Sequence, residues 1–372
     1  MLIIFCIVLI PANGLAWNVV MYGNRRHVPI EDVSRFYKLG DPVKGEKEFQ
    51  IESPGRTIRG KIGTREIYIN NVKYILCFPT LKKGRDILIS AMDVTKILEP
   101  VLRPGKIKNA GPVRTVILDA GHGGHDSGAT GRRGMEKEAA LDVVLRAKRL
   151  LESQGYTVRM TRSSDVFIPL EQRAAYANRF PDAIFVSVHF NKSTKGTASG
   201  IETFALAPRG VPSMDEQNFS YSDLRQHPGH ARDPENIALA TALHSSMLRK
   251  MRLYDRGIKR ARFVVIRDIK VPGVLLEGGF MNHPVDGNLI ASSSFRDAFA
   301  KAILEGVNRY SSAVSGKVGT SPMPSAVAKA TDPTSVPDIR RNFFPTRMSA
   351  TLNEAVQRTA ESFKKEIETD GN

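Results

Sequence analysis

The sequence predicts an α/β fold: a mostly parallel, twisted sheet with helices on both faces, preceded by a small α+β domain. Between residues 112 and 310, strand-like and helix-like segments alternate with short loops, as in parallel sheets connected by helices. Before residue 104, short strand-like runs such as Arg65–Asn70 and Lys73–Phe78 are separated by turn-forming residues. A chain of 372 residues, 41% hydrophobic, is long enough for both units.

The first residues have the pattern of an export signal. Met1–Ile10 is almost wholly apolar, and the small residues Gly14 and Ala16 follow, which is typical of a signal peptide cleaved after residue 16. The apolar run is shorter than the roughly 20 residues that span a bilayer. We therefore expect residues 1–16 to be removed, and the protein to be exported to the periplasm or cell envelope without a transmembrane span.

Residues 17–104 are expected to form an accessory, stalk-like domain. Two segments, His27–Phe36 and Asp86–Ile97, each resemble a short strand entering a helix, and Pro100 is expected to end the second helix. This part of the chain loosely resembles the copper amine oxidase N-terminal-like domain, a small α+β module. The resemblance implies no copper.

Residues 112–310 are expected to form the larger domain. Strands are predicted over Arg114–Asp119, Tyr156–Thr161, Ala183–His189, Ile201–Ala205, Phe263–Ile266 and Val274–Glu277. Helices are predicted over Glu138–Gln154, Leu170–Arg179, Pro234–Met251 and Phe295–Tyr310, because apolar residues recur there with helical spacing. In such sheets, ligands bind at the carboxyl ends of the strands.

Three further segments break this alternation. Residues 208–233 are polar, rich in turn formers and without clear periodicity, so we interpret them as an insertion. Residues 311–338 are rich in Ser, Ala, Pro and Gly, a composition that predicts a disordered linker. Residues 339–372 are expected to form a charged, helical tail.

The charge balance favours anionic partners. The chain has 54 Lys and Arg against 38 Asp and Glu, a net charge of +16, which suits an acidic cell-wall polymer. The basic residues are scattered and form no nucleic-acid-binding signature, so no nucleic acid is expected as a partner. Only Cys6 and Cys77 occur, which excludes a zinc site built from several thiolates.

Four polar residues lie where metal chemistry is expected. His122 follows a predicted strand inside a glycine-rich loop, and His189 ends another strand. Glu136 comes just before a predicted helix, and Glu277 ends an otherwise apolar strand, where a carboxylate is costly unless it is paired or functional. Two histidines and a carboxylate are a ligand set of hydrolytic zinc sites, and a further Glu can act as acid and base.

Together, the motifs around these residues resemble the zinc-dependent N-acetylmuramoyl-L-alanine amidases of the amidase-3 family. The resemblance covers roughly Val113 to Tyr310. The motifs that carry it are Asp119–Gly124, Met135–Glu138, Ser187–Asn191 and Leu276–Phe280, with Met160–Arg162 and Asp165, Leu170–Arg173, Gly200–Thr203 and Gly279–Asn282 flanking them.

The resemblance implies a function and a role for each of these residues. His122, Glu136 and His189 would be the Zn²⁺ ligands, and Glu277 would be the catalytic carboxylate that moves a proton from water to the leaving L-alanine nitrogen. The substrate would be peptidoglycan, cut between N-acetylmuramic acid and L-alanine for wall remodelling, daughter-cell separation or recycling.

Other residues have weaker assignments. Asn191, His125 and Glu202 are candidates for contacting the substrate, whereas Arg162 and Arg173 are expected to form structural ion pairs. Related enzymes carry an inhibitory helix near the position of the 208–233 insertion, so we expect this insertion to cover the cleft. An activator protein is a further candidate partner, and the sequence does not tell whether activity requires one.

Two alternative functions stay open. A zinc carboxypeptidase that trims wall peptides would use the same ligand set. Such an enzyme usually needs an Arg that binds the terminal carboxylate of the peptide, and no motif in the sequence clearly identifies one. A non-catalytic peptidoglycan-binding protein would suit the basic charge. The presence of all four site residues, His122, Glu136, His189 and Glu277, argues against this second alternative.

Overall fold

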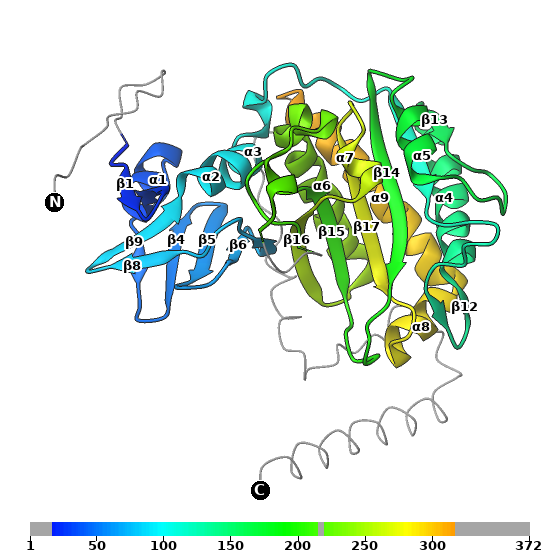
Figure 1. The fold of residues 1–372 in the computed structure, drawn as a ribbon, viewed down its shortest axis with the longest axis horizontal. Helices are drawn as coiled ribbons and strands as arrows, with labels where there is room; N and C mark the ends of the chain where they lie inside the picture. Colours follow the sequence, from blue (N-terminus) through cyan, green and yellow to red (C-terminus); the bar gives the residue numbers. More distant parts are fainter. Residues whose placement is uncertain (1–16, 215–218, 317–372) are drawn as a thin grey trace, which may run out of the picture. The chain divides into compact units, whose positions relative to one another are not determined.

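The computed structural model describes residues 17–214 and 219–316 (Figure 1). The predicted signal peptide, the tail over residues 339–372 and most of the predicted linker lie outside this range. Residues 311–314, which we expected to belong to the linker, instead continue the last helix. No helix within the described part of the chain has the length and apolar character needed to cross a membrane.

The N-terminal part contains a small antiparallel sheet of order β1-β2-β9-β8. Its strands are β1 (Val20–Tyr22), β2 (Arg25–Pro29), β8 (Leu81–Lys83) and β9 (Asp86–Ser90). Helix α1 (Ile30–Tyr37) follows β2, and α2 (Ala91–Asp93) with the π-helical turn η1 (Val94–Leu98) follows β9. The two strand-to-helix segments predicted from the sequence are therefore neighbours, paired through Val28 and Ile89.

Pro100 does not end the helix as predicted. The helical backbone continues through it: Pro100 follows the π-helical turn η1 and lies in α3 (Glu99–Leu102). A 3-10 turn, η2 (Pro104–Lys106), then leads to the larger domain.

A second, eleven-stranded sheet runs through both parts of the chain. Its N-terminal half is an antiparallel series: β3 (Val43–Lys44), β4 (Glu48–Ser53), β5 (Arg56–Lys61), β6 (Glu66–Ile69) and β7 (Val72–Ile75). Strand β7 joins the C-terminal half through a single bridge between Tyr74 and Ile258. The Lys73 amide and the Tyr74 hydroxyl add hydrogen bonds to Asp255 and Thr241, at 2.9 and 3.0 Å.

The C-terminal half has the order β13-β10-β14-β17-β15-β16. Its strands are β10 (Thr115–Ala120), β13 (Thr157–Met160), β14 (Ala183–Asn191), β15 (Ile201–Leu206), β16 (Asp255–Ala261) and β17 (Gly273–Phe280). All neighbouring pairs are parallel except β15 and β17. Consequently β15 and β16 begin at the end of the sheet where the other four strands finish.

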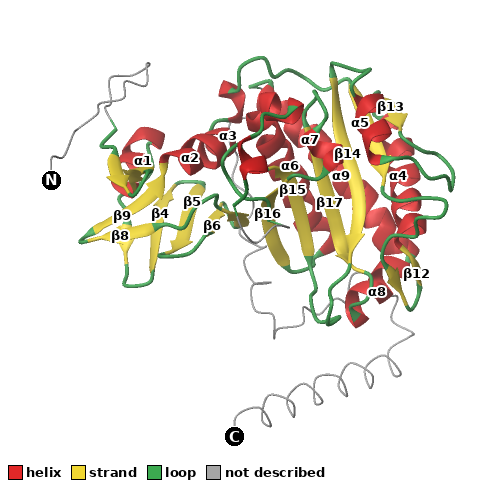
Figure 2. Ribbon diagram, viewed as in Figure 1, coloured by secondary structure: helices red, strands yellow, loops and turns green. Residues whose placement is uncertain are grey.

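Helices cover both faces of this half, which confirms the predicted fold class (Figure 2). The long helices α4 (Glu136–Ser153), α6 (Asp233–Met251) and α9 (Ser293–Val314) form one layer. The short helices α5 (Leu170–Ala177) and α7 (Val264–Arg267) pack on the opposite face over Phe185, Phe204 and Leu275. Helix α8 (Pro284–Ala291) and the hairpin of β11 (Thr130–Gly131) with β12 (Gly134–Met135) complete this part.

The strand predicted over Phe263–Ile266 is wrong, because these residues enter helix α7. The strand of this region lies earlier, at β16, which contains two Arg and one Lys among Gly, Ile and Ala. Its cations find partners inside the protein, as Arg260 does with Asp233 at 2.7 Å. Because those partners are distant in the sequence, the segment by itself resembles a polar loop.

The described part of the 208–233 insertion does not cover the cleft as expected. It follows β15, whose far end lies beside the start of β17 because these two strands are antiparallel. There the Met214 amide donates to the Arg260 carbonyl at 2.9 Å, and Arg262 forms an ion pair with the buried Asp223. The short turns η3 (Tyr221–Leu224) and η4 (Pro228–Arg232) therefore lie at the opposite end of the sheet from Glu277.

Candidate metal centre and catalytic carboxylate

Three predicted site residues converge at the carboxyl ends of β10 and β14. Glu136, the first residue of α4, lies between two imidazole rings, with its Oε1 3.1 Å from His122 Nε2 and 2.8 Å from His189 Nδ1. The three donor atoms lie within 4.8 Å of one another. This donor set and spacing fit a divalent transition metal, and two imidazoles with one carboxylate leave a coordination position open.

Close packing of the backbone brings these ligands together. A Cβ at Gly121 would overlap the His189 ring, and a Cβ at Gly128 would lie 2.5 Å from both Glu136 Oε2 and the His122 ring. Any larger residue at either position would displace a candidate ligand. The glycines of this loop are therefore required by the approach of the side chains, beyond the turns they allow.

His122 is held in a left-handed backbone conformation, with φ of 58°. Non-glycine residues adopt this region only when their surroundings enforce it, and such strain clusters at functional sites. Arg173 donates to the His122 carbonyl at 2.7 Å, and Arg162 donates to the Gly121 carbonyl at 2.6 Å. Arg173 also forms the expected ion pair, with Asp119 at 2.8 Å, whereas Arg162 donates to further carbonyl oxygens.

A second carboxylate lies behind His122. Asp126 Oδ2 is 2.8 Å from His122 Nδ1, the ring nitrogen that points away from Glu136. Such a partner fixes the ring orientation and increases the basicity of a metal-binding imidazole. Asp126 was not among the predicted site residues, although its position four residues after His122 in the same loop was visible in the sequence.

The charges of the cluster reinforce one another. Burial alone would lower the pKa of His122, but the hydrogen bonds and charges of Glu136 and Asp126 raise it above its ordinary value. Burial would raise the pKa of Glu136, yet hydrogen bonds from both histidines, together with their charges, lower it strongly. Glu136 therefore stays ionised across the neutral range, as a metal ligand requires.

Glu277 lies on β17 directly beside His189 in the strand register. Its Oε2 is buried and has no hydrogen-bond partner among the described residues, which is costly unless something else binds there. Burial, followed by the negative charges of Glu136 and Glu202, raises the pKa of Glu277 well above its ordinary value. A raised pKa favours the protonated form of a carboxyl group, which can donate a proton to a leaving group.

Two of the three candidates for substrate contact, Glu202 and Asn191, lie beside this carboxylate. Glu202 on β15 is the cross-strand partner of Glu277, and it accepts a hydrogen bond from Asn191 Nδ2 at 3.1 Å. The exposed His125 lies outside the ligand cluster and packs against Phe167, with a ring separation of 4.3 Å. Two cations that the sequence did not single out, Arg256 and Lys259, both contact Glu202 from β16.

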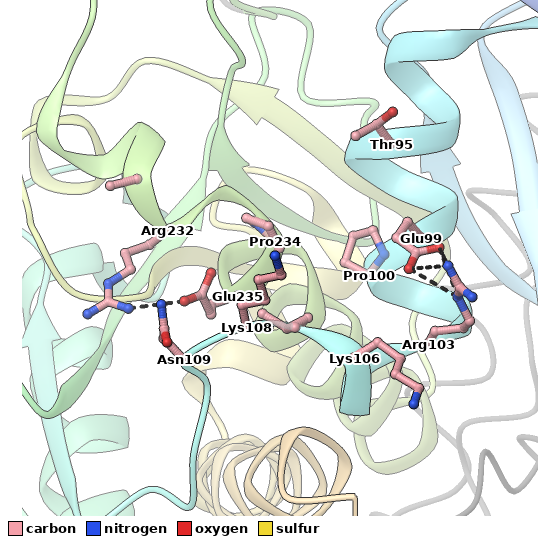
Figure 3. A pocket seen from close by; sticks show the side chains of 12 residues that line it. Thr95, Glu99, Pro100, Arg103, Lys106, Lys108, Asn109, Arg232, Pro234 and Glu235 are labelled. Carbon is pink, nitrogen blue, oxygen red and sulfur yellow. Dashed lines mark hydrogen bonds and ion pairs between the residues drawn. The ribbon is translucent and has the colours of Figure 1, made fainter. Parts of the chain in front are cut away.

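A separate cavity of about 410 Å³ lies away from this site, where α3 and η2 face the start of α6 (Figure 3). Its acidic residues are already paired, Glu99 with Arg103 and Glu235 with Arg232. None of the candidate ligands lines this cavity. The cavity is therefore separate from the candidate metal centre.

The comparison with protein families decides the identity of the larger domain. A sequence model described as N-acetylmuramoyl-L-alanine amidase matches residues 116–309, just over half the chain. The chain belongs to the amidase-3 family. The matched residues run from β10 into α9 and include His122, Glu136, His189 and Glu277. The chain is thus an enzyme of the N-acetylmuramoyl-L-alanine amidase class.

Known amidases show how far the similarity extends. AmiA of Escherichia coli K12 is 33% identical over 227 residues, which cover 55% of this chain and 78% of AmiA. AmiC of Neisseria meningitidis is 34% identical over 56% of this chain and 55% of its own length. Among solved structures, the amidase AmiC2 of Nostoc punctiforme is 28% identical over 54% of this chain and 98% of its own, with a TM-score of 0.45. Residues before the matched region are not included in the family assignment.

Proposed function

We propose that this amidase hydrolyses the bond between N-acetylmuramic acid and L-alanine in peptidoglycan, with Zn²⁺ as its cofactor, and so releases stem peptides. The observation that carries the proposal is Glu277, whose buried Oε2 has no hydrogen-bond partner among the described residues and lies beside a cluster of two histidines and a carboxylate. A carboxyl oxygen without a protein partner next to an open ligand cluster is placed to contact a water molecule and the leaving group.

The zinc ligands in this proposal are His122 Nε2, Glu136 Oε1 and His189 Nδ1. Zinc bound there would polarise the scissile carbonyl and lower the pKa of water toward 7. Asp126 keeps the His122 ring oriented, and Arg173 and Arg162 hold the loop that presents it. The protein residues thus supply a rigid, three-ligand face toward the substrate.

Glu277 moves the proton in the proposed reaction. Its carboxylate accepts a proton from the attacking water and then donates it to the L-alanine nitrogen as the amide bond breaks. Burial and the negative charges of Glu136 and Glu202 raise the pKa of Glu277, which favours holding the proton once the group has accepted it. Asn191 and Glu202 lie next to it and, with His125, remain the proposed substrate contacts.

The proposed setting is the periplasm or cell envelope. The predicted signal peptide over residues 1–16 and the net charge of +16 support export and contact with an acidic wall polymer. The stalk-like role of residues 17–104 and the need for an activator protein stay predictions. They do not enter the chemistry proposed for the site.

The test is mass spectrometry of the products formed from purified peptidoglycan by the zinc-loaded protein. We expect stem peptides with a free N-terminal L-alanine. Replacing Glu277 by Gln should lower the rate about 100- to 10,000-fold, the usual contribution of a general acid–base group, with zinc content unchanged. The metal content of both proteins, measured by elemental analysis, controls for loss of the site.

Other products would favour the alternative functions. Released terminal amino acids, with stems still attached to glycan, would assign a carboxypeptidase. Binding to the wall without any product, from a protein that contains zinc, would indicate a non-catalytic binding protein. Either outcome would contradict the amidase proposal.

A further inference from the structure

Two cations on β16 reach the same carboxylate although they are three residues apart. Arg256 Nε is 2.5 Å and Lys259 Nζ is 2.6 Å from Glu202 Oε1. In a regular strand, residues at odd spacing point to opposite faces. A β-bulge removes the contradiction, because Arg256 and Gly257 together lie opposite Glu202 alone, and Gly257 has φ of 93°. The bulge therefore turns Arg256 toward the face that carries Glu277.

The guanidinium of Arg256 retains unused donors. Only its Nε has a hydrogen-bond partner among the described residues, which leaves both terminal nitrogens available. Its side chain is 30% exposed, and the guanidinium carbon lies 5.1 Å from the centre of the Phe280 ring. A cation–π contact of this kind attracts the guanidinium to the ring and limits its motion. The guanidinium of Arg256 is thus partly exposed and held in one orientation, and its free N–H groups are suited to bind a carboxylate.

Lys259 frees Arg256 for this role. Glu202 is only 4% exposed and needs a cation, and Lys259 already provides one at 2.6 Å. The charge of Arg256 is therefore in excess of what Glu202 requires. An excess positive charge next to the catalytic carboxylate favours an anionic part of the substrate.

The distance between Arg256 and Glu277 limits which carboxylate of the stem peptide Arg256 can bind. Glu277 and Glu202 are cross-strand partners, and β16 is the next strand, so the Arg256 backbone lies two strand spacings, about 10 Å, from that of Glu277, and its guanidinium lies between them at Glu202. A peptide advances at most about 3.5 Å per residue. The second stem residue therefore places its carboxylate about 7 Å from the scissile nitrogen, whereas the end of a four- or five-residue stem would lie about 14–17 Å away.

We infer that Arg256 binds the free α-carboxylate of the second stem residue, a D-glutamate joined onward through its γ-carboxyl, and so sets the substrate preference of this amidase. This inference rests on the proposed function, whose cleaved bond fixes where the stem begins. It also gives a role to the arginine that the sequence did not mark. A terminal carboxylate, as a carboxypeptidase would hold it, lies beyond the reach of Arg256 in a full-length stem.

The experiment compares two tripeptide substrates that differ in one group. They are N-acetylmuramoyl-L-alanyl-γ-D-glutamyl-L-lysine and the same molecule with its glutamate α-carboxyl converted to an amide. The wild-type zinc enzyme should cleave the carboxylate form with a kcat/KM about 10- to 100-fold higher, the value of a charge-assisted hydrogen bond. In Arg256→Gln this ratio should fall to about one, with little change for the amide form.

Two further variants separate binding from folding. Arg256→Lys keeps the charge without the fork and should retain only part of the preference. Arg149→Gln removes an exposed arginine of α4 and should leave the ratio unchanged. Arg256→Gln should fold, because Lys259 still pairs with Glu202.

Two results would overturn the inference: equal cleavage of both substrates by the wild type, or equal losses on both in Arg256→Gln. Cleavage of neither substrate would instead contradict the proposed function. In that case, calorimetry measures the affinity of the Glu277→Gln protein for each substrate. If Arg256 binds the α-carboxylate, this protein must bind the carboxylate form more tightly than the amide form. Equal affinities would overturn the inference.

Discussion

The residue that the structure adds beside the candidate metal ligands is Asp126. It lies on the outer side of the His122 ring, 2.8 Å from Nδ1, while Glu136 lies on the inner side. The two carboxylates together hold the imidazole in one orientation and raise its pKa against the effect of burial. Metal affinity at this site should therefore depend on a residue that does not touch the metal.

Replacing Asp126 by Asn should weaken zinc binding about 10- to 100-fold at pH 7.5, the usual cost of losing such a partner. The loss should be smaller at pH 6. In the wild type the raised pKa of His122 means that protons compete with zinc there, and removing the Asp126 charge lowers that pKa. Competition with a chelating dye at both pH values measures the two affinities.

Asp182→Asn is the matched control, because Asp182 is exposed and lies before β14, outside the cluster. It should leave the affinity unchanged at either pH. A ratio of variant to wild-type dissociation constants that grows on acidification would contradict the expected direction of the effect.

At the scale of elements, the sequence was most informative where strands are buried on both faces. β10, β14 and β17 are mostly apolar, so they and the polar residues near their ends could be recognised. The structure brings His122, Glu136 and His189 together there. Their roles as zinc ligands and that of Glu277 as the catalytic carboxylate stay predictions.

The sequence was least informative at β16 and the insertion that precedes α6. The strand is rich in cations whose partners, Glu202 and Asp233, come from distant parts of the chain. The position of the insertion depends on the direction of β15, and sequence periodicity carries no information about strand direction. For the same reasons, the sequence alone does not mark Arg256.

The bulge at Gly257 gives a prediction for this element. Gly257→Ala introduces a side chain at φ of 93° and places its Cβ 3.2 Å from Lys73 Cγ. We expect a loss of about 1–3 kcal/mol in the free energy of unfolding, from backbone strain. Because the bulge aims Arg256, the preference for the α-carboxylate substrate should also fall.

Gly63→Ala is the control for strain alone. Gly63 also has positive φ, 78°, but its Cβ would meet nothing within 4 Å. Urea denaturation should show a comparable destabilisation, while the substrate preference stays that of the wild type. If both variants kept the full preference, the bulge would not be what orients Arg256.

For the whole molecule, the important feature is the sheet shared by the N-terminal and C-terminal parts. β7 covers the edge of β16, and the Arg260 side chain, only 1% exposed, donates to the Lys96 carbonyl at 2.6 Å. The sequence predicted a boundary near residue 104, and backbone hydrogen bonding continues across it. Strand pairing between distant segments is long-range, so local sequence patterns do not reveal it.

Removing residues 17–107 should therefore expose β16 as an edge strand and leave the buried Arg260 without one of its acceptors. We expect a shortened protein that aggregates or unfolds at a markedly lower temperature, as measured by light scattering and calorimetry. A chain that lacks residues 317–372 instead serves as the control for truncation. A monomeric N-terminal truncation with an unchanged unfolding temperature would show that the two parts are independent.

Because β15 and β16 run opposite to the other strands of the C-terminal half, the two groups of candidate site residues come from different kinds of segment: one mainly from strand ends and one from strand beginnings. The metal cluster comes from the loop after β10, the start of α4 and the end of β14, whereas Glu202 and Arg256 stand at the beginnings of their strands. The loops before those strands, residues 192–200 and 252–254, contain none of the three candidate ligands and lie next to Glu202 and Arg256 in the chain. In evolution or in engineering, substitutions at the beginnings of β15 and β16 could therefore change the peptide preference while the ligand residues themselves stay the same.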